Sequence, residues 1–154
     1  RLNAVFSGND GGNLEYVKKR AQELDLLDQV FFVGFLNEEE LPYCYQGSIA
    51  LVMPTYFGPT NIPPLEAFIL GVPVLYSDLP GLRDQVEGAA LLMDLLDPES
   101  MAKNLNKLIN DKDFKEALIK SGYAKMLALK YNNQLNILED ICHVFQRKRI
   151  SWNN

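Results

Sequence analysis

The stretch that decides the fold reads Pro54-Thr55-Tyr56-Phe57-Gly58-Pro59-Thr60-Asn61-Ile62-Pro63-Pro64-Leu65-Glu66-Ala67. It follows the apolar run 49–53, which predicts a buried strand, and leads into a helix predicted over 63–70 and ended by Gly71. Gly58 permits a sharp turn, and Asn61 suits a helix N-cap. A strand, a loop and a helix in this order are the repeating unit of parallel α/β proteins.

The same alternation continues on both sides of this stretch. Further strands are predicted at 2–6, 30–33, 72–76 and 89–93, and further helices at 14–26, 98–110, 113–129 and 133–147. Asn37, followed by three glutamates, predicts the start of another short helix. Short apolar strands between helices predict a Rossmann-like α/β fold, a parallel sheet with helices on both faces. We expect this domain over residues 1–132 and a C-terminal helical tail over 133–154.

Composition excludes several classes of protein. The 154 residues are 47% hydrophobic with a formal net charge of -5, so neither disorder nor a nucleic-acid partner is expected. The two cysteines, Cys44 and Cys142, form no disulfide framework and no metal-ligand spacing, which fits a reducing, cytoplasmic setting. No apolar run is long enough to span a membrane. The first residue is Arg1 rather than Met, which suggests a piece of a longer protein.

Ligands of open parallel sheets bind at the carboxyl ends of the strands, so the loop 54–61 is the best candidate site. The N–H groups of Thr60, Asn61 and Ile62 are expected to face an anion, and the dipole of the following helix adds to that attraction. Glu66, one turn into the helix, suits the two hydroxyls of a ribose. The alternative is a loop that only caps a helix, with Glu66 exposed.

Two other loops are weaker candidates. The glycine-rich turn 7–12, which contains Gly8, does not match G-x-G-x-x-G and is expected to line the crevice as a strand-to-helix turn. Phe35 and Leu36 follow the strand at 30–33. They are expected either to pack against a flat base or to belong to the core.

These segments together resemble the signature of retaining GT-B glycosyltransferases, family GT4 or glycosyltransferase group 1. The matching pieces, in the family's order, are 30–35, 52–55, 63–67, 71–74, 77–78, 81–86 and 97–98. The resemblance covers nearly the whole chain and implies the C-terminal, donor-binding half of such an enzyme. It further implies transfer of a sugar from a nucleotide-diphosphate sugar to a glycan or lipid-linked acceptor. It also implies a hexosyltransferase-type enzyme, inactive as a fragment.

The resemblance also carries expectations about context. Cell-envelope or capsular polysaccharide synthesis is the expected pathway, in the cytoplasm or at the inner face of the membrane. Membrane association would come only through parts outside this chain. No metal and no cofactor besides the donor is expected.

The chain departs from the family pattern at one key position. The family's motif has two glutamates eight positions apart; Glu66 matches the second, which holds the ribose in the family, but Gly58 stands at the first. Thr60 or Asn61 is expected to take over the polar contacts of the absent carboxylate. Gly58 also favours one alternative, a non-catalytic GT-B-like domain used for protein contacts. A GT-B sugar-nucleotide epimerase is the other.

The family's first strand, central in a 3-2-1-4-5-6 sheet, and the basic pair that follows it have no counterpart here. Two sheet edges would then be unpaired. We expect the strands that flank the gap to pair directly, or a neighbouring chain to pair with them in a homo-oligomer.

Overall fold

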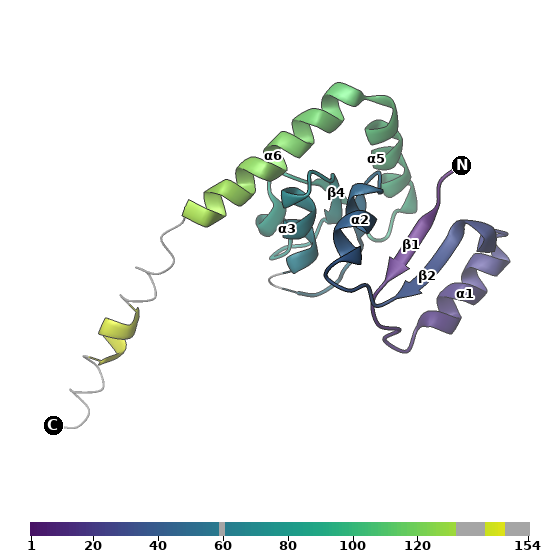
Figure 1. Ribbon diagram of the computed structural model, residues 1–154, viewed down its shortest axis with the longest axis horizontal. Helices are drawn as coiled ribbons and strands as arrows, with labels where there is room; N and C mark the ends of the chain where they lie inside the picture. Colours follow the sequence, from purple (N-terminus) through teal and green to yellow (C-terminus); the bar gives the residue numbers. More distant parts are fainter. Residues whose placement is uncertain (59–60, 132–140, 147–154) are drawn as a thin grey trace. The chain divides into compact units, whose positions relative to one another are not determined.

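The computed structural model describes residues 1–58, 61–131 and 141–146 (Figure 1). The chain divides into two compact units, Arg1–Ser48 and Ile49–Asn154. The predicted domain boundary after residue 132 and most of the predicted helix 133–147 lie outside the described residues. Residues 141–146 are helical. The boundary therefore stays a prediction.

The first unit is a βαβ arrangement followed by a short helix. Its two strands pair in parallel, with Ala4 opposite Val30 and Phe6 opposite Phe32, whose rings stack at 5.3 Å between centroids. The elements are β1 (Ala4–Ser7), α1 (Leu14–Glu23), the 3₁₀ turn η1 (Leu27–Gln29), β2 (Val30–Gly34) and α2 (Glu40–Gln46). Parallel pairing across an intervening helix is what the sequence predicts for this segment.

The start of α2 confirms the predicted Asn37 cap. Asn37 Oδ1 accepts hydrogen bonds from the backbone N–H groups of Glu39 and Glu40, both at 2.9 Å. Glu40 Oε2 in turn accepts from the Asn37 N–H at 3.1 Å, which completes a reciprocal capping box. The acidic run at 38–40 thus serves a helix N-terminus.

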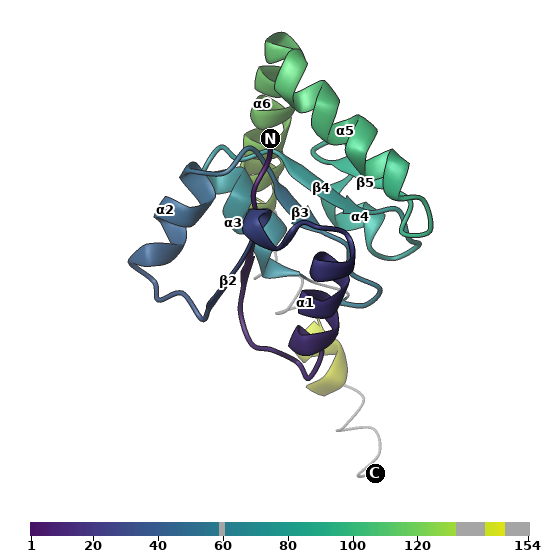
Figure 2. The same ribbon diagram turned by 90° about the vertical axis from the view of Figure 1, so that its right-hand side faces the viewer.

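The second unit holds a three-stranded parallel sheet of order β3-β4-β5. The central strand β4 is buried at every residue, as expected for a parallel strand covered on both faces. α5 lies beside β5, and α6 packs against α3 (Figure 2). The elements are β3 (Leu51–Met53), α3 (Ile62–Ile69), β4 (Val74–Ser77), α4 (Arg83–Val86), β5 (Leu91–Met93), α5 (Pro98–Asn110) and α6 (Lys112–Tyr131).

Two contacts fix the helices of this unit. The core cluster of Leu75, Met93 and Leu108 joins the sheet to α5. In addition, Gly122 of α6 lies so close to Phe68 of α3 that an added Cβ would be 2.6 Å from the ring. α3 ends as predicted near Gly71, whose φ of +70° allows the backbone bonds of a Schellman motif.

The strands form two separate sheets, β1-β2 and β3-β4-β5, instead of one. Direct pairing of the strands that flank the gap, β1 and β3, would join the two units and stays a prediction. β1 has one partner, β2, and β3 has one partner, β4, so each is a sheet edge among the described residues. Pairing with a neighbouring chain stays a prediction.

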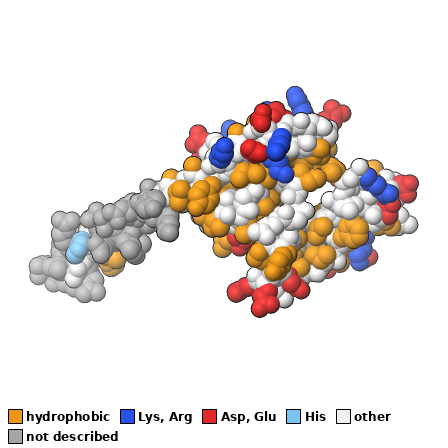
Figure 3. All heavy atoms as spheres, turned by 45° about the horizontal axis from the view of Figure 1, so that its top comes forward, with side chains coloured by type: hydrophobic (Ala, Val, Ile, Leu, Met, Phe, Trp, Pro, Cys, Tyr) orange, Lys and Arg blue, Asp and Glu red, His pale blue; other side chains and the backbone are white. Residues whose placement is uncertain are grey.

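Large apolar side chains of the first unit's sheet reach the surface. Figure 3 shows hydrophobic side chains on the surface of the molecule. Val5, Phe31 and Val33 alternate with Phe6 on the two faces of the pair, and all four are between 45% and 50% exposed. Strands that are apolar on both faces normally lie inside a larger sheet. Within the described ranges, no helix is both long and apolar enough to cross a lipid bilayer.

Candidate functional site

The loop after β3 carries the strongest sequence candidates. Thr55 Oγ1 lies 3.3 Å from the Phe57 N–H and 2.6 Å from its carbonyl oxygen, which folds the loop's first turn. Gly58 follows with a φ of +127°, a conformation that L side chains rarely adopt. Pro59 and Thr60 lie outside the described residues, so the role predicted for Thr60 stays a prediction.

Asn61 occupies the N-cap position of α3 but does not cap it with its side chain. Its backbone is extended, at φ -88° and ψ 124°, as an N-cap requires. The side-chain Nδ2 instead donates to the Gly58 carbonyl oxygen at 3.0 Å and to the Tyr76 hydroxyl. The predicted position is thus confirmed, and the predicted capping bond is absent because the side chain turns toward the loop and β4.

The backbone of Asn61 is also occupied. Its N–H donates to Gln85 Oε1 at 3.0 Å, and Gln85 Nε2 donates back to its carbonyl oxygen at 2.5 Å. The prediction that the Asn61 N–H is free for an anion is therefore wrong. No hydrogen bond from the Ile62 N–H is found within residues 1–58, 61–131 and 141–146. Within the described part of the chain, the Ile62 N–H is therefore the amide at the start of α3 for which no partner is found.

The geometry around Gly58 accounts for the absent carboxylate. A Cβ added to Gly58 would lie 2.3 Å from Asn61 Oδ1 and 2.8 Å from its Nδ2. Any side chain at this position must therefore displace that of Asn61. The Asn61 amide is the polar group that a side chain at position 58 would meet.

Glu66 lies one turn into α3. It is half-buried and four residues after Ile62, which places both on one helix face. The opposite side of α3 is buried through Pro64, Ala67 and Phe68. Glu66 therefore lies on the same face of α3 as Ile62. Its ribose contact stays a prediction.

The remaining candidates belong to the first unit. Gly8, with φ +113°, donates its N–H to the Gly34 carbonyl oxygen at 2.7 Å, so the loops after β1 and β2 begin side by side. Phe35 is 80% exposed, so the interpretation as a core residue is wrong for it. Leu36 is half-buried. Base contacts of Gly8, Phe35 and Leu36 stay predictions.

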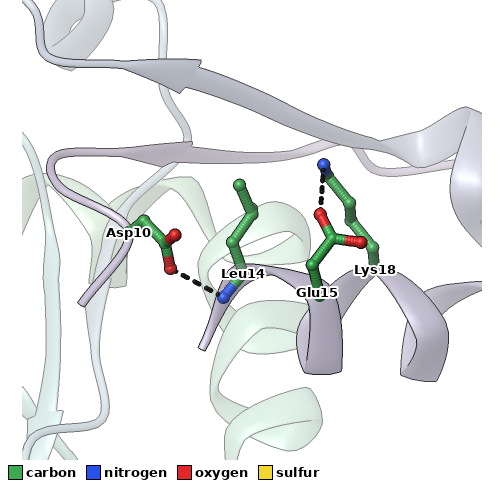
Figure 4. Close-up of polar contacts among 4 residues, drawn as sticks. All are labelled: Asp10, Leu14, Glu15 and Lys18. Carbon is green, nitrogen blue, oxygen red and sulfur yellow. Dashed lines mark hydrogen bonds and ion pairs between the residues drawn. The ribbon is translucent and has the colours of Figure 1, made fainter. Parts of the chain in front are cut away.

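The glycine-rich turn 7–12 leads into α1, and the Asp10 carboxylate accepts a hydrogen bond at the N-terminus of this helix. Asp10 Oδ1 accepts from the Leu14 N–H at 3.0 Å, and Lys18 pairs with Glu15 on the next turn of α1 (Figure 4). A phosphate bound there would have to displace the Asp10 carboxylate. The role of this turn stays a prediction.

Charged side chains elsewhere form surface pairs. Arg83 at the start of α4 pairs with Asp78 at 3.1 Å. On α1, the hydrogen bond from Arg20 to Glu23 raises the pKa of that guanidinium. Among the residues that the structure describes, no group of three or more His, Cys, Asp or Glu side chains could hold a metal ion.

Comparison with known proteins decides the family. The model of "Glycosyl transferases group 1" matches residues 1–125. The chain belongs to this family. Its match takes in the first unit and the second unit as far as residue 125, including β1 to β5 and the loop 54–61 that leads into α3.

The named relatives of this glycosyltransferase group 1 protein are glycosyltransferases. It is 33% identical over 130 residues to the D-inositol 3-phosphate glycosyltransferase of Corynebacterium jeikeium, covering 83% of this chain and 30% of the relative. It is 28% identical over 102 residues to O-antigen chain mannosyltransferase B of Escherichia coli, covering 66% and 27%. The chain thus spans about a third of the length of the curated relatives it matches.

The fold of this glycosyltransferase group 1 protein is that of solved GT-B glycosyltransferases. It superposes on Anabaena HepE, solved in complex with UDP, with a TM-score of 0.75 at 20% identity, covering 95% of this chain and 41% of HepE. This similarity confirms the predicted fold class, an α/β arrangement of parallel strands flanked by helices.

Proposed function

We propose that this chain is the donor-binding part of a retaining glycosyltransferase. The whole enzyme would transfer a sugar from a nucleotide-diphosphate sugar to a glycan or lipid-linked acceptor. The family match over residues 1–125 carries the proposal. One named relative, an O-antigen chain mannosyltransferase, acts on a glycan chain by its name, and another is named for D-inositol 3-phosphate. HepE, which shares the fold, binds UDP and UDP-glucose.

The start of α3 is the proposed diphosphate site. The open Ile62 N–H and the dipole of an eight-residue helix attract a diphosphate. Negative charge grows on this diphosphate as the glycosidic bond to the donor sugar breaks. A fixed N–H donor at that point stabilises the leaving group without reorganising during the reaction.

Further residues from both units are proposed to contact the donor. Glu66, on the same face of α3 as Ile62, would accept hydrogen bonds from the ribose hydroxyls. Asn61 and Thr60 would supply polar contacts near the sugar in place of a carboxylate at position 58. The exposed Phe35 ring, with Leu36 and the turn at Gly8, would contact the base. No metal or organic cofactor is part of this proposal.

The setting follows from the same proposal. A donor of this class is a cytoplasmic metabolite, so we place the enzyme in the cytoplasm or at the inner face of the membrane. An acceptor in cell-envelope or capsular polysaccharide synthesis fits an O-antigen mannosyltransferase among the relatives.

Calorimetric titration of the full-length protein with UDP, GDP and ADP, and with their sugar conjugates, tests the donor site. We expect one diphosphate nucleotide to bind saturably. Glu66→Ala should weaken that binding by about 1.5–3 kcal/mol, the worth of a hydrogen bond to a charged group. Glu116→Ala, at an exposed carboxylate of α6, is the matched control and should leave the affinity unchanged. Equal affinities for both variants would refute the role of Glu66.

A second candidate function is a non-catalytic domain that keeps the fold for protein contacts. Gly58 favours it, because the side chain of Asn61 fills the space that a carboxylate's Cβ would need. Failure of every diphosphate nucleotide to bind would support this alternative. Unchanged donor affinity after Thr60→Ala combined with Asn61→Ala would show that neither side chain replaces the family's carboxylate.

A further inference from the structure

The Gln85 side chain binds both backbone polar groups of Asn61. Its Oε1 accepts from the Asn61 N–H at 3.0 Å, and its Nε2 donates to the Asn61 carbonyl oxygen at 2.5 Å. An amide that satisfies a backbone donor and acceptor together reproduces the pairing of a neighbouring strand. Two bonds from one planar group fix the orientation of the backbone at Asn61.

Tyr76 adds a third attachment. It is fully buried in β4, and its hydroxyl accepts from Asn61 Nδ2 while lying 3.4 Å from Gln85 Oε1. Gln85 and Tyr76 come from α4 and β4, the βα unit that follows α3 in the chain. Asn61 is therefore held by its backbone and its side chain from outside α3.

The carbonyl oxygen of Asn61 and the N–H of Ile62 belong to the same peptide unit. The described chain has no cis peptide bond, so this unit is trans and planar and its C=O and N–H point in opposite directions. A hydrogen bond that fixes the carbonyl oxygen therefore also fixes the direction of the N–H. Gln85 Nε2 makes that bond.

We propose that Gln85 is a positioning residue for the nucleotide diphosphate: by holding the Asn61 carbonyl, it directs the Ile62 N–H toward the bound phosphate. The proposal rests on the proposed donor site at α3. Gln85 acts through the peptide unit and need not touch the ligand. Its loss should reduce affinity for the phosphate part of the donor and leave recognition of the base and ribose intact.

Gln85→Met tests this role, because methionine keeps the length of the side chain and makes neither hydrogen bond. Gln22→Met, at an exposed position of α1, is the matched control. The full-length protein and both variants are titrated with UDP, GDP and ADP, and with uridine, guanosine and adenosine in competition. Gln85→Met should weaken the preferred diphosphate about tenfold, and change the affinity for its nucleoside by less than about twofold. The control should match the wild type.

A measurement on the wild type guards against a variant that does not fold. The backbone amide resonance of Ile62 should shift downfield during titration with the preferred diphosphate and not with its nucleoside. An unresponsive Ile62 amide at saturation would overturn the proposal, as would a Gln85→Met variant with wild-type affinity or an equal loss for the nucleoside.

These results separate the two levels of the proposal. If the wild type binds a diphosphate but the variant or amide data contradict the prediction, the positioning role falls and the donor site stands. If the wild type binds no diphosphate nucleotide, the proposed function falls and takes the role of Gln85 with it.

Discussion

Gly58→Ala should destabilise the second unit more than any other change of glycine to alanine in a loop of this unit. A φ of +127° is open to glycine and costs about 1–3 kcal/mol for an L residue. The new Cβ would also lie 2.3 Å from Asn61 Oδ1, so the Asn61 side chain must leave. Its bonds to the Gly58 carbonyl and the Tyr76 hydroxyl then break, at about 1 kcal/mol each.

With partial relaxation of the loop, we expect a total loss of about 2–4 kcal/mol in the free energy of unfolding. Urea titration monitored by circular dichroism measures it as a lower midpoint at constant m-value. Gly88→Ala is the matched control, because Gly88 also has a positive φ, +72°, but its added Cβ would meet no atom within 4 Å. The control therefore contains the strain of a positive φ, at a smaller angle than that of Gly58, without the collision.

A double-mutant cycle with Asn61→Ala isolates the collision. Asn61→Ala alone loses the same two hydrogen bonds, so the double variant should be about 1–2 kcal/mol more stable than the sum of the single losses predicts. A Gly58→Ala protein within about 0.5 kcal/mol of Gly88→Ala would refute the reasoning, as would strict additivity in the cycle.

Three further predictions concern packing, capping and assembly. Gly122→Ala should lower the stability by about 1–3 kcal/mol, because its Cβ would lie 2.6 Å from the Phe68 ring; Ser121→Ala, at the exposed neighbour, should not, and thermal unfolding compares the two. Asp10→Ala should cost about 1 kcal/mol and speed amide hydrogen exchange at the start of α1, since the Leu14 N–H loses its acceptor; unchanged exchange would contradict the cap. Light scattering should find the 154-residue chain as an oligomer, because the edges of β1 and β3 are expected to pair between chains, and a monomer at every concentration would exclude this pairing.

The sequence predicted best the elements whose ends are determined locally. α5 spans Pro98–Asn110 as predicted, because Asp97 caps the helix through the Glu99 N–H and Pro98 suits its first turn. The Asn37 cap was likewise predictable, since all of its partners lie within three residues. Signals of this kind are complete within one turn of helix.

The candidate site was predictable in position but not in detail. Gly58, Asn61 and Glu66 could be recognised because glycine, an N-cap residue and a carboxylate have distinct local roles. The partner of Asn61, Gln85, is 24 residues away in a helix of only four residues, and no periodicity connects the two. Such a contact arises from tertiary packing, and it reversed the prediction for the Asn61 N–H.

The division into two sheets could not be predicted from the sequence, for a different reason. Each strand is apolar on both faces, which predicts parallel pairing but does not specify which edge joins which. β1 with β2 and β3 with β4 were predictable as neighbours through a helical crossover. Whether β1 and β3 pair depends on how the chain between them runs and on how favourable it is to cover their exposed edges. A local sequence pattern contains neither kind of information.

α6 contacts both helices that meet at Asn61. Gly122 receives the Phe68 ring of α3, and Lys125 Nζ donates at 3.2 Å to the carbonyl oxygen of Asp84, the residue before Gln85 in α4. With 20 residues, α6 is about 30 Å long and stiff along its axis. A sideways load on its C-terminal end would act as a torque on α3 and α4 at once. A variant that displaces α6 is therefore expected to disturb the packing of α3 and of α4 together.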